Sequence, residues 1–101
     1  MRTVDLAVYA DELAARAATL AAQLERANAR LRRAAIEKEA CRALDERLVT
    51  QLEALDVLRN ADTLAARAEI RELAAALHAV EKLQGWVEER LFAAREEVSA
   101  A

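Results

Sequence analysis

The sequence predicts an all-α fold, a long antiparallel helical hairpin that forms a single domain over residues 1–101. The chain contains no proline and one glycine, whereas a β-sandwich or barrel needs turn residues every ~8–12 positions. Hydrophobic residues make up 55% of the chain but aromatic residues only 3%, which is typical of Ala- and Leu-rich long helices. Apolar side chains also recur at spacings of three and four residues along both halves of the chain.

The first helix is predicted from about residue 3 to residue 59. Its apolar residues recur every seven positions, with companions three or four residues further on. The stripe changes phase near residues 36–41, where Lys38 interrupts it. Because no glycine or proline lies there, we expect the helix to be continuous. The heptad positions are Leu6, Leu13, Leu20, Ala27, Ala34, Cys41, Leu48 and Leu55.

The second helix is predicted from about residue 62 to residue 99. Its seam alternates spacings of three and four without interruption and contains one polar residue, Gln84. Gly85 lies beside the seam and weakens the helix by ~1 kcal/mol relative to alanine, so we expect it not to end the helix. The seam consists of Ile70, Leu73, Leu77, Val80, Gln84, Val87, Leu91, Ala94 and Val98.

The turn between the helices is predicted near Arg59–Thr63. Asn60 tolerates the left-handed conformation that closes a helix, and Asp62 or Thr63 can cap the next one. A hairpin that closes here aligns apolar residues across the seam. The expected facing pairs are Leu24 with Val98, Leu31 with Leu91, Ala34 with Val87, Cys41 with Val80 and Leu58 with Leu64.

Two apolar surfaces remain without a partner in this hairpin. Residues 1–20 extend past the second helix, and a second alanine-rich strip follows each helix away from the seam. Bare leucines at such sites favour association with a second copy, which gives an elongated four-helix bundle or coiled coil. The candidate interface residues are Leu6, Tyr9, Leu13, Leu20, Ile36, Leu83 and Trp86.

The densest cluster of basic residues comprises Arg26, Arg30, Arg32 and Arg33. One interpretation is a patch for phosphate or for an acidic partner. The favoured one is structural: the hairpin places Arg26 opposite Glu96 and Arg33 opposite Glu89, as coiled-coil flanks commonly do. No aromatic residue accompanies the cluster, and the net charge is −3, so we expect no nucleic-acid binding.

No motif in the sequence predicts catalysis. His78 lacks the HExxH and ExxH spacings of metal ligands, and the carboxylates Glu72 and Glu81, six and three residues away, make only a weak case for a metal. Cys41 lies on the apolar seam, where cysteine acts as a small hydrophobic residue. We therefore expect no enzyme activity, cofactor, metal or small-molecule substrate. A less favoured alternative is a small dimeric helical enzyme that uses arginine, lysine and glutamine side chains. Residues of these types are Arg16, Arg33, Lys38 and Gln84.

Together these features predict a structural or interaction module that forms a homodimer. The alternative is an adaptor or chaperone whose exposed strip, or whose N-terminal extension, binds another protein's helix. No stretch of ~18 uninterrupted apolar residues occurs, so we expect no membrane span. The single cysteine excludes an internal disulfide and favours the reducing cytoplasm.

Overall fold

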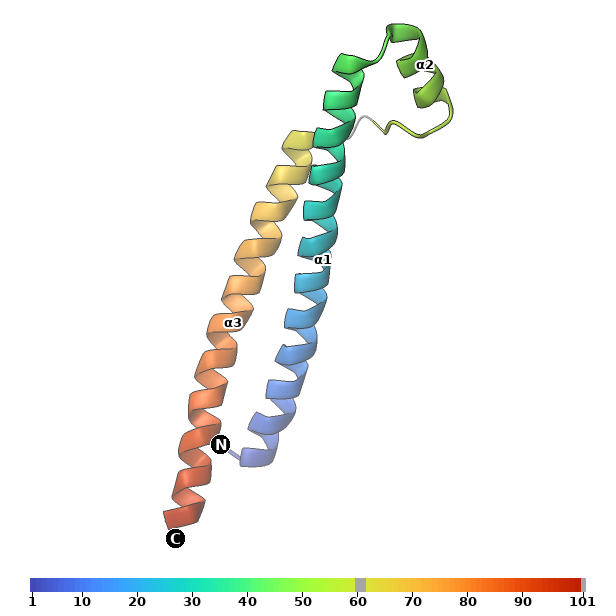
Figure 1. Cartoon of the computed structure of the whole chain (residues 1–101). Coiled ribbons are helices and arrows are strands. Elements are labelled where there is room, and N and C mark those ends of the chain that lie inside the picture. Colours follow the sequence, from blue (N-terminus) through green and yellow to red (C-terminus); the bar gives the residue numbers. More distant parts are fainter. Residues whose placement is uncertain (60–61, 101) are drawn as a thin grey trace. The chain divides into compact units, whose positions relative to one another are not determined.

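The computed structural model describes residues 1–59 and 62–100, with only the backbone at residues 98–100. The described residues form an all-α fold. Its helices are α1 (Thr3–Ala43), α2 (Glu46–Ala54) and α3 (Thr63–Ala100) (Figure 1). Helix α1 is continuous through residues 36–41, and α3 is continuous through Gly85, as the sequence predicts. Within these ranges no helix has both the length and the apolar character of a membrane span.

The first helix does not reach residue 59, and this prediction is wrong. Helix α1 ends at Ala43, and a separate helix begins after Asp45, whose backbone is extended (φ −71°, ψ 158°). The Asp45 carboxylate accepts a hydrogen bond of 2.9 Å from the backbone N–H of Leu48. An aspartate that caps a new helix in this way satisfies free N–H groups that a continuous helix does not have. This local capping outweighs the leucine spacing, which continues across the break.

Helix α2 ends in a Schellman motif. Asp56 adopts a left-handed conformation with φ 59°. The N–H of Val57 bonds to the carbonyl of Leu52 and the N–H of Asp56 to the carbonyl of Glu53, both at 3.0 Å. These two bonds satisfy carbonyl groups at the end of the helix, and they turn the chain away from the α2 axis.

Helix α3 begins where the sequence predicts. The Asp62 carboxylate oxygen Oδ1 accepts hydrogen bonds of 3.1 Å from the backbone N–H groups of Leu64 and Ala65. Asp62 is therefore the N-cap, which confirms one of the two predicted caps. Residues 60 and 61 of the predicted turn, Asn60 included, lie outside the described residues.

The chain divides into two compact units, which are described separately. Unit 1 comprises Met1–Gln23 and Leu73–Ala101. In it, the first part of α1 and the last part of α3 run side by side in opposite directions (Figure 1). Its hydrophobic core joins both helices, and Val87 in this core has no exposed surface. The buried residues of this core are Leu6, Leu13, Val87 and Leu91, with Ala7, Ala10 and Val80 packed against them.

Unit 2 comprises Leu24–Glu72 and so contains the second part of α1, all of α2 and the start of α3. Among the described residues of this unit, the buried side chains are those of Ala27, Ala34 and Leu58. The Glu37 carboxylate of α1 holds the segment after α2, because it accepts a 3.4 Å hydrogen bond from the backbone N–H of Arg59. Leu58 is therefore buried just beyond a helix that has no buried residue of its own.

The predicted register and overhang are both wrong. Leu91 lies in one cluster with Leu6 and Leu13 rather than opposite Leu31. Leu58 is buried, whereas its expected partner Leu64 is 77% exposed. The physical reason is the connection from α1 to α3, which includes the whole of α2 instead of a short turn. The first residues of α1 consequently meet α3 within unit 1, and they do not extend past it.

Candidate protein interface

A strip of residues that are exposed, except for the half-buried Ala76, follows α3 within unit 1, on a different face from the buried seam. Trp86 is 46% exposed and Leu83 is 37% exposed. Alanines continue the strip towards the start of α3, and an arginine and an alanine continue it towards the end. We call this surface the α3 strip. It consists of Ala76, Ala79, Leu83, Trp86, Arg90 and Ala93.

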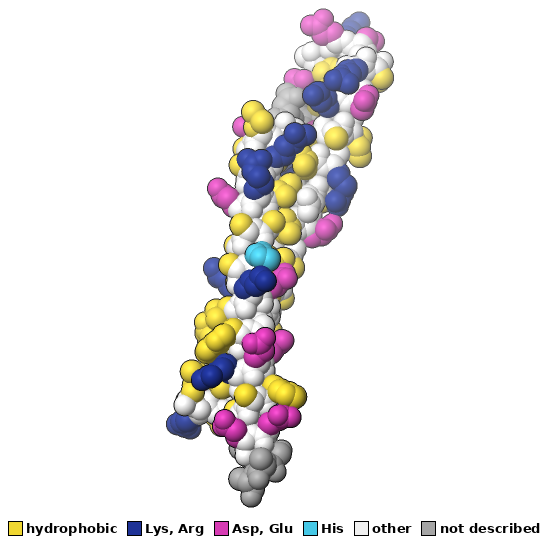
Figure 2. All heavy atoms as spheres, turned by 90° about the vertical axis from the view of Figure 1, so that its left-hand side faces the viewer, with side chains coloured by type: hydrophobic (Ala, Val, Ile, Leu, Met, Phe, Trp, Pro, Cys, Tyr) yellow, Lys and Arg dark blue, Asp and Glu magenta, His cyan; other side chains and the backbone are white. Residues whose placement is uncertain are grey.

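The Arg90 guanidinium lies over the Trp86 ring, with 5.6 Å between its central carbon and the ring centroid. A spacing of four residues on a helix brings the two side chains together, and the negative face of the indole attracts the cation. Figure 2 views the side on which α3 lies, and it shows hydrophobic side chains interspersed with charged ones. The sequence identified Leu83 and Trp86 as candidate interface residues. Continuing their spacing by four and then three residues also finds Arg90 and Ala93.

The seven predicted interface residues fall into two groups. Leu6, Leu13 and Leu20 are buried within the chain, so they offer no surface to a partner. The other four remain exposed. Besides Leu83 and Trp86 on α3, Tyr9 is 40% exposed in unit 1 and Ile36 is 68% exposed in unit 2.

Three of the four arginines in the predicted basic cluster pair with carboxylates. Both Glu69 oxygens accept hydrogen bonds from Nη2 of Arg30, at 2.9 and 3.0 Å. Arg32 pairs with Glu25 at 3.0 Å, and Arg26 is exposed. The pairs other than Arg30–Glu69 lie along α1 itself, although the sequence predicted carboxylates of the second helix.

Arg33 pairs with Glu37 at 3.1 Å, so its predicted pairing with Glu89 is wrong. It also donates a hydrogen bond of 3.4 Å to the carbonyl of Val57. The same Glu37 side chain accepts the N–H of Arg59, so these contacts fasten the segment after α2 to α1. Arg33 therefore acts in the folding of unit 2.

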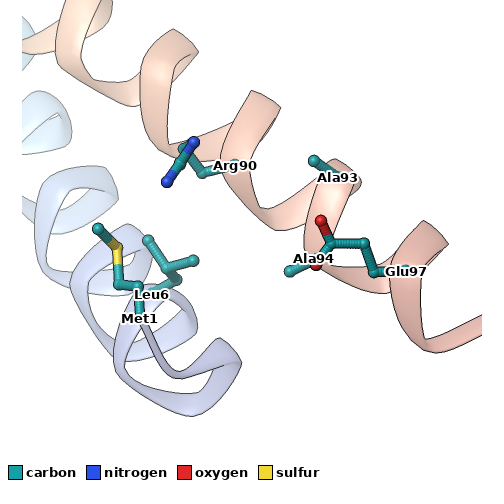
Figure 3. Close-up of a pocket in the computed structure, with 6 residues that line it drawn as sticks. All are labelled: Met1, Leu6, Arg90, Ala93, Ala94 and Glu97. Atoms are coloured by element: carbon teal, nitrogen blue, oxygen red, sulfur yellow. The ribbon is translucent and has the colours of Figure 1, made fainter.

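A small pocket opens between the ends of α1 and α3 in unit 1 (Figure 3). Arg90 points from α3 towards α1, where Met1 and Leu6 form the opposite wall. Its volume is about 170 Å³, below the roughly 300–1,000 Å³ typical of small-molecule sites. A pocket of this volume does not favour the binding of a small-molecule substrate. The remaining lining residues are Ala93, Ala94 and Glu97.

Residues considered for chemistry are dispersed. His78 is exposed beside Glu81 and Lys82, and Cys41 is half-buried. In the described part of the chain, no group of three or more His, Cys, Asp or Glu residues is placed to hold a metal. Of the residues for the enzymatic alternative, Arg33 and Lys38 belong to unit 2, whereas Arg16 and Gln84 belong to unit 1.

The surface around α2 was missed by the sequence prediction. Helix α2 has no buried residue, and apolar side chains on and around it are exposed. The local signal for this helix is the pair Asp45–Glu46, an N-cap residue followed by an acidic first turn. The exposed apolar residues are Leu44, Leu48, Leu55 and Val57.

Comparison with known protein families, with characterised proteins and with solved structures finds no match to this chain. The feature of the chain's own geometry that bears on function is exposed apolar surface, on the α3 strip and around α2.

Proposed function

We propose that the protein is a non-enzymatic interaction module, an antiparallel helical hairpin that forms a homodimer of four long helices. The observation that carries this proposal is the exposed area. The chain exposes 7727 Å². A compact monomer of 11.1 kDa is expected to expose about 5,700 Å², so the excess is about 2,000 Å² per chain. Two chains together therefore have an excess of about 4,000 Å², which lies within the roughly 2,000–5,000 Å² that obligate dimers bury in total.

The hairpin is supported by contacts inside each unit. In unit 1, Leu6 and Leu13 of α1 share a core with Val87 of α3. In unit 2, Arg30 of α1 pairs with Glu69 of α3. Two long helices joined by a connection of residues 44–62 account for both sets of contacts.

The dimer is supported by how little the chain buries. The buried hydrophobic residues in the described ranges are six leucine or valine side chains and two alanines. Two helices share one narrow seam, which leaves the other apolar side chains in water. A second hairpin covers them without any change in the fold. We place this dimer in the cytoplasm, where a reducing environment keeps Cys41 a thiol.

Light scattering after size-exclusion chromatography tests the proposal. We expect a mass of twice 11.1 kDa at high concentration, and a fall towards 11.1 kDa on dilution. A mass of 11.1 kDa throughout the micromolar to millimolar range contradicts the dimer. That result favours the adaptor alternative, with the exposed leucines around α2 as the surface for a partner helix.

A further inference from the structure

We propose that the α3 strip binds the α3 strip of a second copy, antiparallel, with Leu83 opposite Trp86 of that copy. The inference rests on the proposed homodimer and specifies its interface and register. The occupant is a second copy because the pattern of sizes and charges along the strip is complementary to itself in the antiparallel arrangement, as described next.

The spacing of the strip is that of a coiled-coil seam. From Ala76 to Ala93 its residues alternate intervals of three and four, the repeat that keeps one face of a helix towards a partner helix. The buried seam of unit 1, which includes Val80 and Val87, follows the neighbouring face. Helix α3 therefore presents two adjacent seams, one used within the chain and one exposed.

Side-chain size favours the antiparallel arrangement. A two-fold axis near residues 84–85 places Leu83 opposite Trp86 of the second copy, and the reverse. It also places Arg90 opposite Ala79, whose small side chain leaves room for the arginine stem and its stacked indole. At the outer end, Ala76 meets Ala93, which allows the backbones to approach closely. A parallel dimer instead places Arg90 opposite Arg90, and the like charges repel.

The charges beside the strip favour the same register. Lys82 flanks the strip on one side of the axis, and Glu89 of the second copy lies opposite, so symmetry gives two such pairs. Both side chains are exposed. Neither has an oppositely charged residue three or four positions away on α3. Among the described residues, the ion pairs within the chain do not involve either of them.

Charge reversal tests the register. Lys82→Glu alone or Glu89→Lys alone places like charges opposite each other at two points, and each weakens the dimer by about tenfold or more. The double variant Lys82→Glu with Glu89→Lys restores opposite charges and returns the dissociation constant to within about threefold of wild type. Sedimentation equilibrium measures the constants, and circular dichroism at a dimer-saturating concentration confirms that helicity is retained.

Removal of apolar side chains tests the surface. Leu83→Ser with Trp86→Ser abolishes the dimer, whereas the matched control Leu48→Ser with Leu55→Ser, on and beside α2, leaves it intact. A wild-type dimer that tolerates the α3 variants, or single reversals that the double variant does not rescue, overturns this interface and register while the proposed dimer stands. A wild-type monomer overturns the proposed function together with this inference.

Discussion

Gly85 is the one glycine of the chain, and the addition of a Cβ atom at this position tests whether the surrounding space in α3 is open. It lies in the helix interior, and a Cβ added to it meets no atom within 4 Å. Glycine costs a helix ~1 kcal/mol relative to alanine, mainly because the unfolded chain is freer. Nothing within the described chain requires glycine at this position.

We therefore predict that Gly85→Ala stabilises the protein by about 1 kcal/mol and raises Tm by about 4–8 °C. Thermal unfolding followed by circular dichroism measures the effect. The reverse change at an exposed helical position, Ala74→Gly, is the control and lowers Tm by a similar amount. A loss of stability in Gly85→Ala contradicts the finding that a Cβ at this position has open space around it.

Capping residues show what the sequence can and cannot predict at this scale. Asp62 was identified because it follows a break in the apolar pattern, and it does cap α3. Asp45 has the same chemistry but lies where the leucine spacing continues, so the pattern conceals it. Asp56 is a non-glycine residue with positive φ, which propensity alone does not predict.

At the scale of elements, hydrophobic spacing predicts which face of a helix is buried better than where the helix ends. The seven-residue repeat from Leu6 to Ala34 marks the buried face of α1, although Leu6, Leu13 and Leu20 were expected to lie bare until a second copy covered them. Beyond Cys41 the same spacing includes Leu48 and Leu55, which are exposed. Hydrophobic spacing describes one helix at a time. Which residues of α3 face α1 depends also on the length of the connection between the two helices, and this connection contains α2.

Two leucine truncations on α3 test the observed register. Leu91 is buried in unit 1, so Leu91→Ala leaves a cavity and lowers the free energy of unfolding by about 2 kcal/mol or more. Leu64 is exposed, so Leu64→Ala changes stability by less than about 0.5 kcal/mol. Chemical denaturation measures both at one protein concentration, which keeps any contribution of dimerisation comparable. An equal loss of unfolding free energy in the two variants contradicts this register and favours the predicted hairpin with a short turn.

At the scale of the whole molecule, the sequence predicted an exposed apolar surface on the last helix, but it identified only some of the residues that form this surface. Leu83 and Trp86 were identified from helical spacing, and both are exposed. The three leucines near the N-terminus were assigned to an interface because the hairpin was aligned on the wrong turn. Their burial inside unit 1 makes the α3 strip the main candidate for association.

Trp86 allows the most direct measurement of that association, because it is the sole tryptophan and is half exposed in one chain. A second copy on the α3 strip covers its indole. We predict that at high concentration its fluorescence is blue-shifted and protected from acrylamide. On dilution it shifts to the red and becomes quenchable, with the same midpoint as the change in mass. Emission and quenching that stay constant across the concentration range contradict the account.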